Sequence, residues 1–252
     1  MSNDMQTNSE NNTHFKNSRR RTFLYVWIAA LIGIVFFAPS ISTHIPEQLI
    51  LKISMNTIVM MTVLQLVVVA TIFSVIGTYL TPRIGFRALL VDLPIKEKVF
   101  WVLLKRQLYY GVSIGFGGAI IAYLIAPDFI AYLNTYSFPS RLFGSLNEEV
   151  ITRWGLMTII VWILWRIFQH GKEIPKIILV YSAILLTQIP FAFGHFVALK
   201  NFGIANPIWS IVTIFIVSFP WGWLFWKQGL ESAFIAHSSF HAFVALFVAV
   251  KL

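Results

Sequence analysis

The sequence predicts an all-α fold, a polytopic transmembrane helical bundle of about seven spans, with six to eight as the range. Hydrophobic residues make up 58% of the 252 positions and charged residues only 12%, unlike the composition of soluble domains. Several apolar windows reach the roughly 20 residues that a helix needs to cross a bilayer. Because backbone groups in hydrocarbon must bond internally, runs of this length form helices rather than barrel strands.

The first 22 residues are polar and end in the basic triplet Arg19-Arg20-Arg21. We interpret residues 1–22 as a disordered cytoplasmic tail. The apolar run that opens at Phe23 lacks a convincing signal-peptide cleavage site, which favours an uncleaved first span. Residues 23–252 then form a single transmembrane helical domain.

Six further apolar segments follow the first span. We expect spans at about 56–80, 107–126, 147–168, 177–199, 207–226 and 230–250. An interfacial or re-entrant helix within 41–54 or 85–101 would change this count. No internal repeat of the inverted transporter kind is visible.

We attribute the net charge of +9 to membrane topology rather than to nucleic-acid binding, because the basic residues flank apolar segments. An inside N-terminus places 14 of the 19 Lys and Arg on cytoplasmic segments, as the positive-inside rule requires. We therefore expect a multi-pass integral protein of a bacterial plasma membrane with a cytoplasmic N-terminus. The absence of cysteine excludes disulfides and thiolate nucleophiles.

Two glutamates stand out because they are the acidic residues inside a predicted span, where a charge is costly and marks a functional site. Glu149 and Arg153 are four residues apart and share a helix face, so they can neutralise each other. Glu148 is rotated by about 100° and lacks this partner, which suits a general base. Alternatively, both glutamates form a charge pair at a helix N-terminus in the water interface.

Three of the histidines, His195, His237 and His241, also fall in predicted spans. The four-residue spacing of His237 and His241 suits a metal site or two donors aimed at one oxyanion. Pro190 and Gly194 indicate a bend beside His195, which taken alone is a satisfied packing residue. Together with the glutamates, these histidines are expected to line one cavity, since polar groups in lipid turn toward a shared interior.

A tryptophan cluster, Trp221, Trp223 and Trp226, precedes Lys227 and is expected at the membrane interface. The chain contains neither a Gly-rich phosphate loop nor a Ser-centred nucleophile elbow. Nucleotide chemistry and serine-hydrolase chemistry therefore receive no support.

Three motifs follow one another in the second half of the chain. They are Glu148-Glu149-x-x-x-Arg153, Phe191-x-x-x-His195 and His237-x-x-x-His241. This series resembles the motifs of the CPBP intramembrane proteases, a family named for CAAX proteases and bacteriocin-processing enzymes and also called Abi. The resemblance covers a core at about residues 145–252.

The resemblance implies a role for each motif residue. Glu148, with His195, would activate a water for attack on the scissile carbonyl. His237 would stabilise the resulting oxyanion. Glu149 and Arg153 would hold the geometry of the site.

His241 occupies a position where this family usually has Asn, so it departs from the pattern. Histidine can still donate a hydrogen bond, but its proton state and ring size differ. If a divalent metal such as zinc is present, its ligands would come from Glu148, His195, His237 and His241. Water activation without a metal is equally compatible with the sequence.

The function that this resemblance favours is an intramembrane endopeptidase that cleaves a peptide or membrane-associated protein. It would act in the maturation of bacteriocins or signalling peptides, or in self-immunity. One alternative is a non-catalytic bacteriocin-immunity or interaction protein, which the departure at His241 favours. Another is a proton-coupled transporter. The expected partners are the peptide substrate and the lipid bilayer, with no nucleic acid.

Overall fold

The computed structural model describes residues 2–45, 53–90, 97–204 and 206–250, with side chains from Arg19 onward except those of His44 and Glu97. The described residues form helices, turns and loops, and none of them lies in a strand. The helices are α1 (Ser2–Ile41), η1 (Ser42–His44), α3 (Met55–Ile84), α4 (Glu97–Ile125), α5 (Pro127–Leu133), α6 (Phe138–Glu149), η2 (Val150–Met157), α7 (Thr158–Gln169), α8 (Ile177–Gly194), α9 (Phe196–Asn201), α10 (Ile208–Gln228) and α11 (Leu230–Ala249).

Seven helical stretches among the described residues are long and apolar enough to cross a membrane. They are Arg19–Ile41, Met55–Ile84, Lys98–Ile125, Phe138–Gln169, Ile177–Asn201, Ile208–Gln228 and Leu230–Ala249. This confirms the predicted all-α polytopic bundle and makes the chain a multi-pass integral membrane protein. Residues 46–52 and 91–96 lie outside the described residues, so the alternative of an extra helix within 41–54 or 85–101 stays a prediction.

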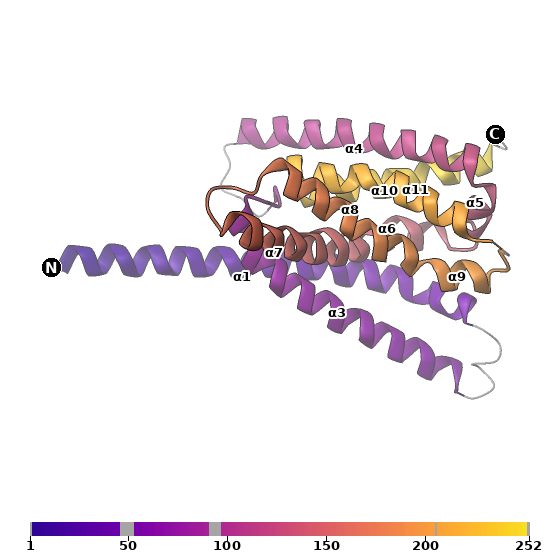
Figure 1. Cartoon of the computed structure of the whole chain (residues 1–252). Helices are drawn as coiled ribbons and strands as arrows, with labels where there is room; N and C mark the ends of the chain where they lie inside the picture. The colour runs from indigo at the N-terminus through magenta and orange to yellow at the C-terminus, as the bar shows by residue number, and fades with distance from the viewer. Residues whose placement is uncertain (1, 46–52, 91–96, 205, 251–252) are drawn as a thin grey trace.

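The first helix, α1, is long, and its N-terminal part extends beyond the bundle (Figure 1). The apolar stretch Arg19–Ile41 is long enough to cross a membrane and contains the predicted start of the first span at Phe23. The division of the chain into a disordered tail at 1–22 and a membrane domain at 23–252 stays a prediction.

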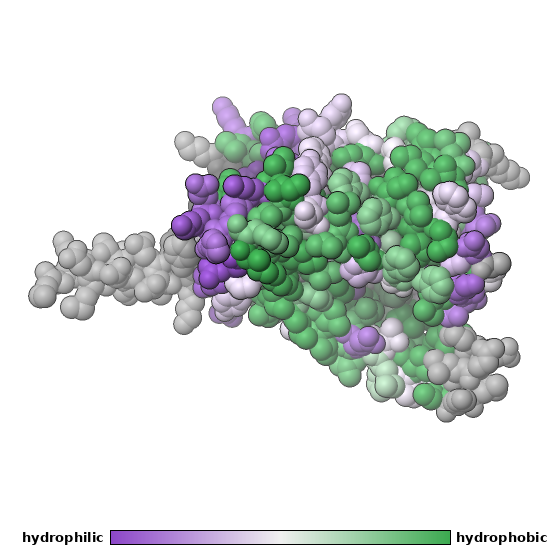
Figure 2. All heavy atoms as spheres, in the orientation of Figure 1, coloured by the Kyte–Doolittle hydropathy of each residue, from purple (hydrophilic) through white to green (hydrophobic). Residues whose placement is uncertain are grey.

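The outer surface of the bundle is apolar, as contact with lipid requires. On α3 the side chains of Met60, Leu64, Val68 and Ile72 recur every four residues and are all exposed, so they form one outward stripe. Figure 2 shows hydrophobic residues over the middle of the visible face and hydrophilic residues gathered near the end from which α1 projects. The hydrophobic composition is therefore explained by solvation in lipid as well as by a core.

Close helix packing in the bundle depends on small residues. A Cβ added at Gly115 of α4 would stand 2.5 Å from the carbonyl oxygen of Ala236 on α11, and one at Gly33 of α1 would stand 2.7 Å from the amide nitrogen of Asn147 on α6. Real Cβ atoms do not approach this closely. Such glycines let helix backbones meet where lipid provides no hydrophobic drive for association, and they fix α6 and α11 in place.

The fourth span begins at Phe138, nine residues before the predicted start at position 147, and it runs through α6, η2 and α7 to Gln169. The prediction was wrong because the first turns carry Ser140, Arg141 and Ser145, which lower the local hydropathy although all three are buried. Glu148 and Glu149 consequently lie well inside the span. The alternative of a charge pair at a helix N-terminus is wrong for the same reason.

The middle of this span, η2, is π-helical. The hydroxyl of Thr158, the first residue of α7, donates back into this segment to the carbonyl oxygen of Arg153, five residues earlier, at 3.2 Å. A π-helical turn widens the helix and changes which side chains share a face, and such turns are frequent at functional sites. Here the π-helical segment follows Glu149 directly and contains Arg153.

Candidate active site

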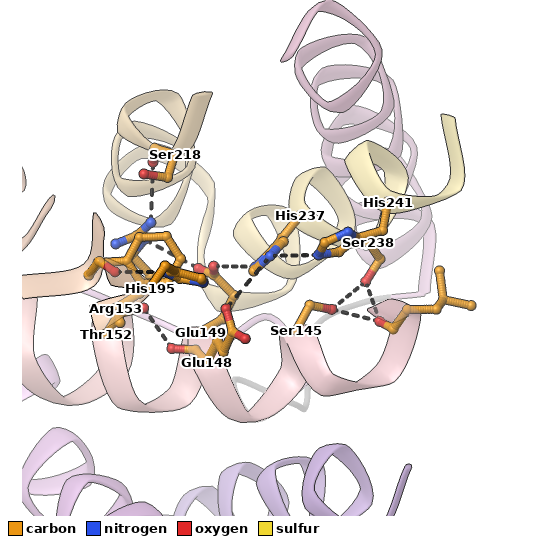
Figure 3. Close-up of polar contacts among 12 residues, drawn as sticks. Ser145, Glu148, Glu149, Thr152, Arg153, His195, Ser218, His237, Ser238 and His241 are labelled. Atoms are coloured by element: carbon orange, nitrogen blue, oxygen red, sulfur yellow. Dashed lines mark hydrogen bonds and ion pairs between the residues drawn. The ribbon is translucent and has the colours of Figure 1, made fainter. Parts of the chain in front are cut away.

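Three separate stretches of the chain bring the predicted site residues together (Figure 3). Glu148 and Glu149 end α6. His195 stands at the break between α8 and α9, as the predicted bend at Pro190 and Gly194 requires. His237 and His241 lie on α11, two turns into the last span. Helix packing therefore brings together residues that lie up to 93 positions apart in the sequence.

Glu149 is the paired glutamate of the two. Its Oε2 lies 3.2 Å from Nε of Arg153, and its Oε1 lies 2.9 Å from Nδ1 of His237. The Glu149 side chain is 1% exposed and that of Arg153 is 0% exposed. Charges this deeply buried are tolerated when they are paired. The predicted pairing of Glu149 with Arg153 is confirmed, and His237 joins it as a third member.

Arg153 is held by further contacts on the side away from Glu149. Its Nη2 donates to the carbonyl oxygen of Ser218 at 3.2 Å, and its guanidinium carbon stands 5.3 Å from the ring centre of Phe191. Gln188 also donates to the Ser218 carbonyl, at 3.1 Å, and accepts from the Ser218 hydroxyl at 2.6 Å. These contacts tie η2 to α8 and α10 behind the site.

His237 is the central side chain of the cluster. Because its Nδ1 faces the carboxylate of Glu149, that nitrogen carries a proton and donates it. Its Nε2 then faces Nε2 of His241 at 3.2 Å and Oε2 of Glu148 at 3.8 Å. The ring is also stacked on Trp221, with centres 4.1 Å apart and planes at 21°. The orientation of His237 is thus fixed on three sides.

Glu148 differs from its neighbour because it remains accessible. Its side chain is 39% exposed and borders a cavity. Its backbone carbonyl oxygen accepts a hydrogen bond from the hydroxyl of Thr152 at 2.6 Å. A carboxylate that reaches a cavity but forms no tight ion pair is able to accept a proton from a molecule bound there.

His195 is half-buried and borders the same cavity. Its Nδ1 donates to the carbonyl oxygen of Phe191 at 2.9 Å, which leaves Nε2 as the nitrogen available for chemistry. Among the described residues no hydrogen bond or ion pair joins His195 to Glu148. The two residues share a cavity wall, which is what joint action on one water requires.

The cavity has a volume of about 220 Å³ and is walled by α1, α5, α6, α8, α10 and α11. Its lining residues are Phe37, Phe129, Tyr132, Leu133, Tyr136, Ser140, Arg141, Gly144, Ser145, Glu148, Phe191, Gly194, His195, Ala198, Ile214, Val217, Trp221, His237, Phe240 and His241. Aromatic and aliphatic side chains dominate, with a few polar groups between them, as is usual for sites that bind organic ligands.

A pair of tyrosines forms part of this wall. The hydroxyls of Tyr132 and Tyr136 lie 2.7 Å apart. Burial of the phenol, the neighbouring Tyr136 and the charge of Glu148 all raise the pKa of Tyr132. Burial also raises the pKa of Tyr136. Both phenols therefore remain protonated at physiological pH.

The described residues do not fit a metal centre. No group of three or more His, Asp or Glu in the described part of the chain is arranged to hold an ion. The Nε2 atoms of His237 and His241 lie 3.2 Å apart, at hydrogen-bonding distance from each other.

Several residues of the site did not stand out in the sequence. Trp221 was expected at the membrane interface, but it is 2% exposed and stacks on His237. Gln188 and Ser218 are neutral and carry no motif, and Arg141 was counted among the charges outside the spans. A buried Gln in a predicted span was the one available signal, because polar side chains in lipid mark helix contacts.

The fold and the cluster define a class, a helical membrane protein with a carboxylate and histidine site suited to acid and base chemistry around an internal cavity. Residues 130–243 match the family described as type II CAAX prenyl endopeptidase Rce1-like. Residues 130–243 thus form an Rce1-like domain, as the resemblance at about residues 145–252 predicted. A comparison with curated proteins found no match, and neither did one with solved structures.

Proposed function

We propose that this protein is an intramembrane endopeptidase that hydrolyses a peptide bond of a peptide or membrane-associated protein by direct attack of an activated water. The single observation that carries this proposal is the contrast between the glutamates. Glu149 is held in an ion pair, whereas Glu148 borders the cavity that His195 and His237 also line. The family to which residues 130–243 belong supports the reaction class.

In the proposed mechanism Glu148 is the general base. A separation of 3.8 Å between Oε2 of Glu148 and Nε2 of His237 accommodates a water that is hydrogen-bonded to both. Glu148 removes a proton from this water as the water oxygen attacks the scissile carbonyl, and His195, which lines the same cavity, assists. Since general bases contribute typically 10²- to 10⁴-fold, roughly this factor is assigned to Glu148.

The oxyanion would be stabilised beside His237. The proton between the Nε2 atoms of His237 and His241, which are 3.2 Å apart, is carried by His241, because His237 already carries one on Nδ1 toward Glu149. An N–H directed at the developing negative charge is worth about 10²-fold or more in a dry site. Histidine at position 241 supplies such a donor where an Asn side chain is usual in the family, so the departure is compatible with catalysis.

The test is hydrolysis by the purified full-length protein in proteoliposomes. The probes are an internally quenched farnesylated peptide that ends in a CAAX sequence and the same peptide without the farnesyl group. We expect cleavage of one or both probes, with loss of activity in Glu148→Gln and His195→Ala. Glu173→Gln, at an exposed glutamate, is the matched control and should keep wild-type activity. A chelator arm tests metal dependence directly.

A second candidate, a non-catalytic immunity or interaction protein, is favoured only by His241. It predicts that Glu148→Gln and His195→Ala fully rescue a deletion phenotype and that neither probe is cleaved. We further propose a bacterial plasma membrane as the location and a cytoplasmic N-terminus. The basic residues near the start of the first span and after α3 support this orientation. Substrate maturation or self-immunity would be the biological role.

A further inference from the structure

The cavity continues along α6 away from Glu148. Arg141, Gly144, Ser145 and Glu148 all line it, and their spacing places them on one face of the helix. The two residues between Arg141 and Glu148 on this face, Gly144 and Ser145, are small and border the same cavity. Arg141 closes the far end of this strip, which we call the α6 strip.

Arg141 is a buried cation without a partner. It is 8% exposed, and its Nε and Nη1 atoms form no hydrogen bond. Among the described side chains no carboxylate forms an ion pair with it. Ser140 Oγ and His241 Nδ1, two further polar atoms of cavity-lining residues, are also buried without partners. A buried guanidinium is rarely left unsatisfied, so the position of Arg141 at the wall of a cavity indicates a ligand that satisfies it.

We propose that Arg141 binds a carboxylate of the peptide substrate and is a specificity-determining residue; this inference rests on the proposed function. Guanidinium groups hold carboxylates through two parallel hydrogen bonds. Arg141 lies in the first turn of α6, after the N-cap Ser137, where the helix dipole also favours an anion. Because the α6 strip joins Arg141 to Glu148 within one cavity, a single bound peptide contacts both.

The spacing places this carboxylate relative to the bond that is cut. Seven residues of α-helix separate Arg141 from Glu148 by about 10 Å. An extended peptide advances about 3.3 Å per residue, so the bound carboxylate lies about three residues from the scissile bond. It is either the terminal carboxylate of the peptide or an acidic side chain at that distance.

Binding to the Glu148→Gln protein in nanodiscs tests the proposal without turnover. The probes are fluorescent farnesylated peptides in three forms: a free C-terminal acid, a C-terminal amide, and an amide with Glu as its last residue. We expect one acidic form to bind about 10- to 100-fold more tightly than the neutral amide. Arg141→Gln in the same background should abolish this preference, Arg141→Lys should keep part of it, and Arg166→Gln, at an exposed arginine, should leave it unchanged.

Each outcome of this experiment decides something. Preference for the free acid identifies the terminal carboxylate, and preference for the Glu form identifies a side chain. Equal binding of all three forms, no binding of any, or an acid preference that survives Arg141→Gln overturns the proposal. Displacement by dihexanoyl phosphatidic acid that depends on Arg141, without discrimination between peptides, would assign the site to lipid phosphate and also overturn it. This experiment also distinguishes failure of this inference from failure of the proposed function. If the proposed function is wrong, the wild-type protein binds the peptide but does not cleave it.

Discussion

The two ends of the cavity differ in whether their buried charged side chains are paired. At the Glu149 end, the carboxylate forms an ion pair with Arg153 and a hydrogen bond with His237, and Ser218 and Trp221 hold these groups in place. At the Arg141 end, no carboxylate among the described side chains pairs with the buried guanidinium. In both arginines Nε and Nη1 form no hydrogen bond, so the difference between the two ends lies in the paired carboxylate. The first arrangement keeps groups rigid for chemistry, whereas the second leaves interaction energy for a ligand. A preorganised site needs the former and substrate recognition needs the latter.

The largest effect that sharpens this comparison is expected at His237. Replacing His237 with Ala removes the ring that positions the proposed oxyanion donor, the Nε2–H of His241, and should lower kcat for peptide hydrolysis by about 10²- to 10³-fold with little change in KM. Steady-state kinetics in proteoliposomes measure both constants. A large rise in KM at unchanged kcat would instead place His237 in substrate binding.

The next effect concerns stability at the paired end. Glu149→Ala leaves Arg153, which is 0% exposed, without its carboxylate. Removing one partner of a buried ion pair costs about 3–5 kcal/mol, so reversible unfolding in mixed micelles should show a loss of this size. A loss below about 1 kcal/mol would mean that the pair behaves like a surface salt bridge.

At the Arg141 end of the cavity, we expect a substitution to change the free energy of unfolding in the opposite direction. Arg141→Met removes buried donors that have no partner, each of which costs about 1–3 kcal/mol. The ligand-free variant should therefore be more stable than the wild-type protein by about that amount, as judged by the same unfolding assay. A destabilised Arg141→Met protein would show that Arg141 supports the fold rather than a ligand.

The smallest effect is a dependence of stability on alkaline pH. Burial raises the pKa of Tyr132 and Tyr136 above the ordinary value of 10.0. The folded state therefore keeps protons that the unfolded state releases, so the stability contributed by these phenols is full below pH 10 and falls as the pH rises beyond it. Replacing both with Phe should weaken this decline in unfolding free energy. An identical decline in the double variant would contradict the assignment.

The seven spans were predictable because lipid solvation makes hydropathy a direct signal of each membrane helix. The start of the fourth span was not, since Ser140, Arg141 and Ser145 face the interior and make a membrane helix look polar. The same feature concealed Arg141 as a site residue. Hydropathy averages over a helix and does not separate its lipid face from its cavity face.

The site was predictable in its residues and less so in its contacts. Four-residue spacing correctly paired Glu149 with Arg153, because both lie on one helix. The bond from Glu149 to His237 joins residues 88 positions apart and follows only from how α6 and α11 pack. Trp221 was misplaced for a related reason, since tryptophan near a lysine is typical of the interface and only tertiary packing stacks it on His237.

The most direct test of the central claim is one turnover of the farnesylated CAAX peptide in ¹⁸O-labelled water, followed by mass spectrometry of both product and intact protein. Attack by a water that Glu148 activates predicts one ¹⁸O atom in the new carboxylate, no peptide fragment attached to the protein at any time, and almost no product from Glu148→Gln. A peptide fragment covalently bound to the protein, or labelled product from Glu148→Gln at the wild-type rate, would contradict it.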